Sequence, residues 1–261
     1  MIDQNEIINW RNILANKRGE IGNEKSDELG YELLELLNDN WGNILEEDLY
    51  IKANKLLLNG ANLNIKEKNT LQTFVMKVAE KGFITLVDLC CKSGADLDLQ
   101  DINGESALMK VANQRVLDIA RKEFKSTGKV TKAKSVLYKF IPMLNYYIHY
   151  DKIMRLLIEN HCDLDLQNNK GLTALSYATK YGVEKSFIRM LVKSGASPLI
   201  ETREKYPRLA SDLANGNENC VEYLHKAEQE WIANNFIRPV NYSPEIYFAE
   251  MDKQAEENIR N

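Results

Sequence analysis

The pentapeptide Asp-Leu-Asp-Leu-Gln occurs twice in the chain, at residues 96–100 and 163–167, and the copies begin 67 residues apart. Four apolar segments also end at related positions, with separations of 34, 67 and 34 residues; these positions are Gly60, Gly94, His161 and Gly195. The long interval corresponds to two periods of 34 and 33 residues. A period of this length predicts a stack of small units that bury their apolar faces against their neighbours.

A second frame repeats with the same period. The segments TFVMKVA, SALMKVA and TALSYAT begin at Thr73, Ser106 and Thr173, which lie 33 and 67 residues apart. A Thr or Ser at the start of a helix can accept a hydrogen bond from its free N–H groups. A glycine at the end of a helix takes a left-handed conformation without a Cβ penalty, so His161 in the same position predicts a strained or adjusted turn. Each unit is therefore predicted to contain two helices and a polar turn.

This pattern resembles the ankyrin repeat, a unit of about 33 residues made of a β-turn and two antiparallel helices. The resemblance covers roughly residues 30–228 and is most specific over residues 67–112 and 151–199. It implies an all-α fold, an ankyrin-type helical solenoid of about four to six units with short β-turn or hairpin tips.

Two flanking segments complete the predicted organisation. Residues 1–29 contain an amphipathic pattern, which predicts a helix that caps the exposed end of the stack. The stack is expected over residues 30–228. Residues 229–261 carry several aromatic side chains, which predicts a C-terminal tail docked on the stack.

The segment at about 113–150 departs from the repeat pattern and leaves two alternatives open. In one, residues 101–167 form two repeats, and the second opens at Ile141. In the other, they form one repeat whose helices extend into a protruding hairpin. The spacing favours two repeats, whereas the charged residues Lys122, Glu123 and Lys125 at an expected apolar position favour the hairpin.

Motifs for catalysis and metal binding are missing from the sequence. HExxH, GxSxG and GxGxxG do not occur, and the three histidines have no partner at a spacing typical of a triad or metal site. The four cysteines lie in helix-like segments without CxxC spacing, which predicts reduced core thiols. The expectation is a protein that is not an enzyme and holds no cofactor or metal.

Composition gives little guidance on partners and location. The net charge is −4 with 28% charged residues, which does not indicate a nucleic-acid or membrane binder. No apolar run approaches the ~20 residues of a membrane span, and the first residues lack the pattern of a secretory signal. A cytoplasmic location is expected, with non-classical export left open.

The resemblance implies that a protein partner binds the concave face of the stack, through the turn tips and the first helices. The chain would then act as a monomer or in a heterocomplex, either as a bacterial or viral effector or as an inhibitor or immunity-type partner. The predicted contact residues at the tips are Asp98, Gln100, Asn103, Asp165, Gln167 and Asn169. Those on the first helices are Lys77, Lys110, Tyr177 and Tyr181.

One basic segment supports an alternative. Residues 121–139 hold seven basic residues and one acid, and Lys129, Lys132 and Lys134 are added to the predicted contacts. Such a segment could bind an anionic ligand or nucleic acid. Nucleic acid is disfavoured because no tyrosine is interleaved with these charges before Tyr138. An enzyme whose site lies on the irregular segments is the remaining alternative.

Overall fold

The computed structural model describes residues 4–37, 46–113, 150–180, 185–214, 218–235, 237–238 and 242–260. Within these residues all regular structure is helical, which confirms the predicted all-α fold. The chain divides into two compact units. Unit 1 holds the described residues up to Val111 together with residues 150–157, and unit 2 holds Ala112, Asn113 and the described residues from Ile158 onward.

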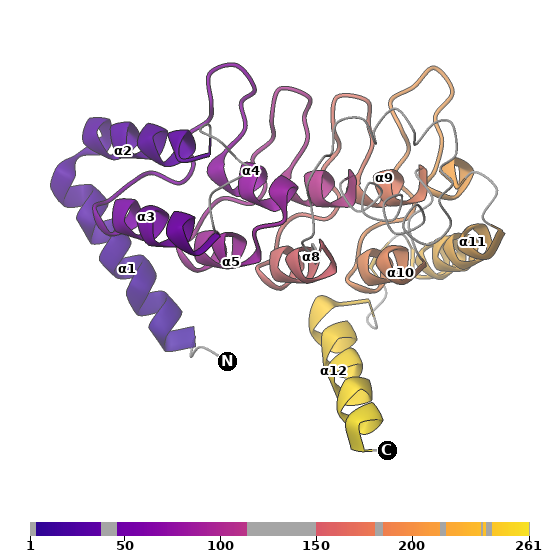
Figure 1. The fold of residues 1–261 in the computed structure, drawn as a ribbon. Coiled ribbons are helices and arrows are strands. Elements are labelled where there is room, and N and C mark those ends of the chain that lie inside the picture. Colours follow the sequence, from indigo (N-terminus) through magenta and orange to yellow (C-terminus); the bar gives the residue numbers. More distant parts are fainter. Residues whose placement is uncertain are drawn as a thin grey trace, which may run out of the picture. The chain divides into compact units, whose positions relative to one another are not determined.

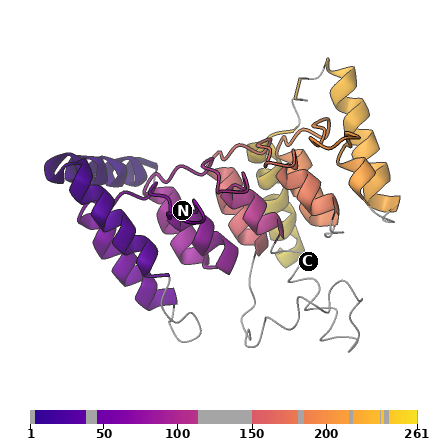
Figure 2. The ribbon, with the colours of Figure 1, turned by 90° about the horizontal axis from the view of Figure 1, so that it is seen from above.

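Unit 1 is built from pairs of helices joined by turns (Figure 1). Residues 107–113 are also helical, and the division between the units falls within the helix at residues 150–159. The helices are α1 (Gln4–Ile21), α2 (Asn23–Glu35), α3 (Glu46–Leu58), α4 (Phe74–Lys81), α5 (Ile84–Lys92) and α8 (Tyr150–Glu159). Helix α5 packs against both α3 and α4, and α4 and α5 lie side by side in Figures 1 and 2.

The core of unit 1 lies between these helices. Phe74 and Val78 of α4 and Leu86 and Val87 of α5 are at most 1% exposed. Burying one such side chain stabilises the fold by about 1.5–3 kcal/mol. Ala79 is completely buried as well, and its small side chain lets neighbouring helices approach closely.

The N-terminal segment forms two helices where the sequence predicted one. Helix α1 ends before Gly22, whose φ of +78° breaks the helical path. Helix α2 begins at Asn23 and runs through the boundary between residues 29 and 30, where the sequence predicted the cap to end and the stack to begin. Helix α1 packs against α2, α3 and α5 and buries Leu14. Ile8 and Ile13, which belong to the predicted amphipathic pattern, are exposed.

Two side chains of α1 bind the C-terminal end of α5. The Trp10 indole N–H donates to the Ser93 hydroxyl at 3.1 Å, and the Arg11 guanidinium donates to the Cys91 carbonyl at 2.8 Å. The last carbonyl groups of a helix have no partner within it, so Arg11 satisfies part of that end. Helix α1 therefore covers one end of the helices in unit 1.

Unit 2 repeats the arrangement of helix pairs (Figure 1). Its elements after α8 are α9 (Ala174–Lys180), α10 (Lys185–Lys193), the 3₁₀ helix η1 (Ser211–Leu213), α11 (Glu218–Ala233) and α12 (Pro244–Arg260). Helix α10 packs against α9, α11 and α12, with Phe187 and Leu191 buried at the centre. In the last pair the first helix is reduced to the single turn η1, and α11 continues beyond the predicted end of the stack at residue 228.

The C-terminal tail packs on unit 2. Tyr242, Tyr247 and Phe248 are buried, and α12 contacts α10. The Tyr242 hydroxyl donates to the carboxylate of Glu230 on α11, and Lys193 Nζ lies 4.0 Å from the Tyr242 ring centroid. These contacts hold the start of α12 against α10 and α11.

The predicted helix ends are confirmed, and two of the three predicted helix starts carry the expected hydrogen bond; at the third, the Thr73 hydroxyl is buried without a partner among the described residues. The backbone has positive φ at Gly60, Gly94 and Gly195 and also at His161, with values of 96°, 78°, 100° and 60°. At the helix starts, Ser106 Oγ accepts from the amide of Met109 at 3.5 Å, and Thr173 Oγ1 accepts from the amide of Ser176 at 3.1 Å. Apart from Thr73, these repeated residues therefore have the local roles that the sequence indicated.

The cysteines are core residues. Cys90, Cys91, Cys162 and Cys220 are all buried, and none forms a disulfide. Burial raises the pKa of the Cys91 thiol to about 12, so this side chain is protonated at neutral pH. Within the described part of the chain, no helix has the length and apolar character needed to cross a membrane.

Candidate functional site

The turns that connect the helix pairs are joined to one another by hydrogen bonds at the period of the sequence. In unit 1 the Asp96 amide donates to Asn64 Oδ1 at 2.9 Å, and the Ile102 amide donates to the Thr70 carbonyl at 2.9 Å. Both bonds join residues 32 positions apart. The turns of unit 1 therefore form one continuous surface.

Unit 2 contains the equivalent bonds. The Ser197 amide donates to Asp165 Oδ1 at 2.8 Å, and the Arg203 amide donates to the Lys170 carbonyl at 3.0 Å. Burial raises the pKa of the Asp165 carboxyl, while its bond to Ser197 acts in the opposite direction. The same positions of the repeat thus carry the same turn-to-turn contacts in both units.

The two Asp-Leu-Asp-Leu-Gln copies fold each turn internally. The first carboxylate accepts from the amide two residues on, at 3.0 Å for Asp96 and 2.9 Å for Asp163. Such Asx turns replace a backbone turn by a side chain. The side-chain amides of Gln100 and Gln167 donate from Nε2 to the backbone carbonyls of Gly104 and Gly171, at 2.5 and 2.9 Å respectively. The pentapeptide recurs because it builds the turn.

Lys77, Lys110 and Tyr177, predicted as contacts on the first helices, are buried. Their exposed fractions are 8%, 8% and 7%. Lys77 Nζ lies 2.7 Å from a carboxylate oxygen of Glu67, and Asn168 Nδ2 donates to the Tyr177 hydroxyl at 3.1 Å. In each case the helix residue reaches back to the turn of its own unit, because the partner lies nine or ten residues upstream.

Lys110 forms ion pairs with two carboxylates of its own turn. Its Nζ lies 2.7 Å from Asp101 and 2.9 Å from Glu105, and Asp101 is 6% exposed. Burial, the largest single cause, lowers the pKa of Lys110, but the hydrogen bonds that its ammonium donates to the two carboxylates, together with nearby negative charge, raise the pKa overall. An expectation of accessible side chains at these three positions does not agree with the structure.

The remaining predicted residues divide by exposure. Asp98, Asn103 and Asn169 are exposed at the tips, whereas Gln100, Asp165 and Gln167 are half-buried in the turns. Tyr181, Lys129, Lys132 and Lys134, along with the basic segment as a whole, lie outside the described residues.

Three exposed apolar residues at the tips were missed by the sequence reasoning. Leu71 and Ile102 in unit 1 are 39% and 57% exposed, and Tyr206 in unit 2 is 74% exposed. Leu71 also has a φ of +56°, which is strained for a bulky residue. A single apolar residue inside a polar turn was the available signal, as in the stretches NTLQ and QDINGE.

The charged groups of this surface are held in contacts with one another. Glu67 is held by Lys77 and Thr70, whose hydrogen bonds lower the pKa of its carboxyl. Among the described residues, no group of three or more His, Cys, Asp or Glu side chains could hold a metal ion. The buried charges of the turns are structural ion pairs.

Helix pairs whose turns bond to one another about 33 residues apart define a helical repeat protein. Residues 143–235, less than half of the chain, match the family model for ankyrin repeats, in three copies. The chain therefore contains ankyrin repeats, and the resemblance and the helical-solenoid fold are confirmed. A comparison with curated proteins finds no match.

Proposed function

We propose that this chain binds a protein partner through the turn tips of unit 1. Ankyrin repeats are generally protein–protein interaction modules, and the match supports that general role. The carrying observation is the pair of exposed apolar side chains, Leu71 and Ile102, on turns joined by the Ile102–Thr70 hydrogen bond. This pair and its surroundings form the tip surface, defined as Leu71 and Ile102 with the exposed Lys68, Asp98 and Asn103.

The tip surface lowers the stability of the unbound chain, and this supports the proposal that it binds a partner. Two large apolar side chains exposed to water gain stability only when a partner covers them. The left-handed backbone at Leu71 costs of order 1–3 kcal/mol, which a glycine would avoid. An apolar centre with a polar rim is the usual composition of a protein-binding patch.

The proposed role is non-enzymatic, because the tip surface offers apolar contact and hydrogen bonding without a reactive group. An effector acting on a host protein and an inhibitor of a toxin or enzyme would use the same surface. They differ in the identity of the captured protein, which the following experiment reports.

A photo-crosslinking amino acid placed at Ile102 should capture the same partner protein repeatedly from a lysate of the source cells. The matched control places it at Ile51 of α3, which is 66% exposed in the same unit and lies away from the tips. Substitution Leu71→Asp should abolish capture at Ile102. Capture that is equal at both positions, or that is unaffected by Leu71→Asp, would overturn the proposal.

A further inference from the structure

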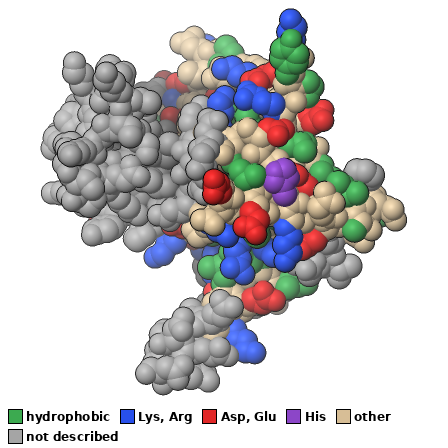
Figure 3. All heavy atoms as spheres, turned by 90° about the vertical axis from the view of Figure 1, so that its right-hand side faces the viewer, with side chains coloured by type: hydrophobic (Ala, Val, Ile, Leu, Met, Phe, Trp, Pro, Cys, Tyr) green, Lys and Arg blue, Asp and Glu red, His purple; other side chains and the backbone are tan. Residues whose placement is uncertain are grey.

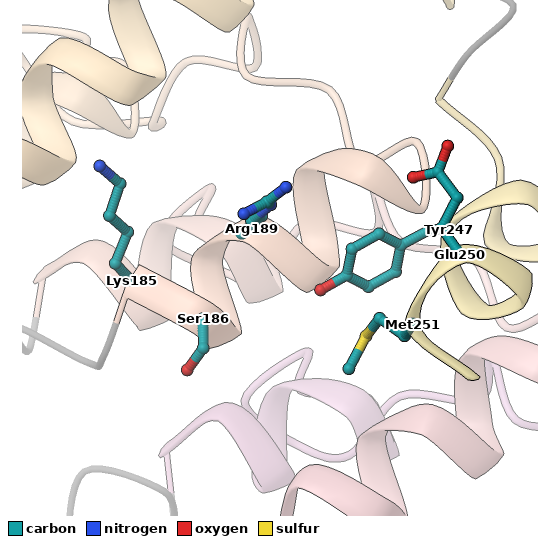
Figure 4. A pocket seen from close by; sticks show the side chains of 6 residues that line it. All are labelled: Lys185, Ser186, Arg189, Tyr247, Glu250 and Met251. Atoms are coloured by element: carbon teal, nitrogen blue, oxygen red, sulfur yellow. The ribbon is translucent and has the colours of Figure 1, made fainter. Parts of the chain in front are cut away.

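The groove between α10 and α12 in unit 2 has a composition that the turn tips do not explain. It encloses about 360 Å³ and is lined by Lys185, Ser186 and Arg189 from α10 and by Tyr247, Glu250 and Met251 from α12. Figure 4 shows Lys185 and Arg189 extending from the same side of α10, and Tyr247 reaching from α12 with its hydroxyl toward that helix. The α10 wall of the groove therefore carries two cations, and the α12 wall carries an aromatic side chain, an apolar side chain and one carboxylate, that of Glu250.

We propose that this groove binds an acidic segment of a protein partner, with carboxylates on Lys185 and Arg189 and an apolar side chain against Tyr247 and Met251. The site is independent of the tip surface, since all of its residues belong to unit 2. The two cations are exposed, and neither forms an ion pair within the described residues. Met251 is 39% exposed although it is apolar.

Tyr223 of α11 lies beside the basic α10 wall but is not one of the residues that line the groove. Its hydroxyl is buried and has no hydrogen-bond partner among the described residues. Leaving such a group unsatisfied costs about 1–3 kcal/mol. Lys185 Nζ lies 5.8 Å from the Tyr223 ring centroid, which places this ring beside the basic wall. Burial raises the pKa of the hydroxyl to about 12, so it keeps its proton at neutral pH.

The spacing of the cations favours a peptide. Lys185 and Arg189 are one helical turn apart, so their Cα atoms are separated by about 6 Å. Carboxylates on residues i and i+2 of an extended peptide are about 7 Å apart, which matches this spacing. The side chain at i+1 of such a peptide points to the opposite side, so an apolar residue at this position can reach the α12 wall. The charges favour an acidic peptide, because cationic and anionic patches attract across an interface.

Nucleic acid fits the groove less well. Duplex DNA carries about one negative charge per 1.7 Å, which these few cations do not match. Seen from the α11 side in Figure 3, the Lys and Arg side chains of unit 2 are interspersed with Asp and Glu and form no continuous basic surface.

The experiment measures fluorescence anisotropy of a labelled peptide with a central Glu-Leu-Glu-Leu-Glu sequence, added to the full chain. We expect saturable binding that weakens with salt and falls at least about tenfold in the double variant Lys185→Gln, Arg189→Gln. A peptide with Gln in place of every Glu should also bind at least about tenfold more weakly.

The matched control is the double variant Lys17→Gln, Lys25→Gln, which removes two exposed lysines from unit 1. It should bind the peptide within about twofold of the unmodified chain. Thermal unfolding of each variant verifies that the fold is intact. The proposal is overturned if no peptide binds, if the Gln peptide binds equally well, or if the two double variants behave alike. Tighter binding of a single-stranded oligonucleotide, or full competition by millimolar inorganic phosphate, would overturn it in favour of a general anion site.

Discussion

The two units solve the same structural problem with different chemistry. In unit 1, Lys110 reaches back to two carboxylates of its own turn, whereas in unit 2 the equivalent Tyr177 accepts a hydrogen bond from Asn168. The turns around both contacts have the same Asx geometry and the same bonds to the neighbouring turn. The repeat therefore requires a side chain long enough to reach its turn, and it accepts either an ion pair or a neutral bond.

The largest expected effect comes from the turn of unit 2. Gly171 has a φ of +77°, and a Cβ at this position would lie 2.2 Å from the backbone nitrogen of Arg203. Since that nitrogen donates to the Lys170 carbonyl, the two turns cannot separate without breaking their bond. We expect Gly171→Ala to lower the free energy of unfolding by more than about 3 kcal/mol, measured by urea denaturation.

Gly94→Ala in unit 1 is the matched control for that substitution. Gly94 has nearly the same φ, +78°, but a Cβ there would meet nothing closer than 3.8 Å. Only the backbone strain remains, so the cost should be about 1 kcal/mol. Equal losses of unfolding free energy for the two substitutions would show that the close approach of Gly171 to the backbone of Arg203 does not contribute to the cost in unit 2.

The next largest effects are expected from removing the contact between helix and turn in each unit. Lys110→Ala leaves Asp101 and Glu105 without their cation, and we expect a loss of about 3 kcal/mol in the free energy of unfolding. Tyr177→Phe removes one neutral bond and should cost about 1 kcal/mol. Chemical denaturation of both variants gives the comparison. A larger loss for Tyr177→Phe would contradict the view that the charged contact is the more demanding one.

A smaller effect, with the opposite sign, is expected at His161. This residue has a φ of +60°, whereas Gly94 and Gly195 occupy the same position of their units. Substitution His161→Gly relieves the strain but adds freedom to the unfolded chain, so the net gain should be at most about 1 kcal/mol. Differential scanning calorimetry should show a higher melting temperature. A lower one would mean that the imidazole makes a stabilising contact.

The smallest effect is a pH dependence confined to the charged turns. Hydrogen bonds from Lys77 and Thr70 lower the pKa of Glu67, so the folded state favours its ionised form. That stability is present above the unfolded pKa of Glu67, near 4.5, and is lost as the pH falls through the lower folded value. The difference in urea midpoint between the unmodified chain and Glu67→Gln should therefore shrink between neutral pH and about pH 3. A constant difference would contradict the assigned ion pair.

The repeat was predictable because period, helix starts and helix ends are local properties of the sequence. Ser106, Thr173 and Gly94 have the predicted local roles, since each acts on backbone groups within a few residues. The break at Gly22 was not predicted, because residues 23–28 after it are all polar and carry no apolar period that would mark a second helix. The short first helix at η1 was likewise hidden by a sequence that matches the repeat.

The site was harder to predict than the fold. Lys77, Lys110 and Tyr177 were read as a row of contacts, but each is buried against a turn residue that only the folded unit brings near. Leu71 and Ile102 stand in polar stretches, where a single apolar residue carries no periodic signal. The α10–α12 groove joins residues about 60 positions apart, and no local pattern marks it.

The most direct test of the tip surface separates binding from stability at one residue. Leu71→Gly removes both the exposed side chain and the strained conformation. Isothermal titration calorimetry with the partner captured at Ile102, together with the melting temperature, gives the two quantities. The proposed function predicts affinity at least about tenfold weaker and a melting temperature that is unchanged or higher. Unchanged affinity would contradict it.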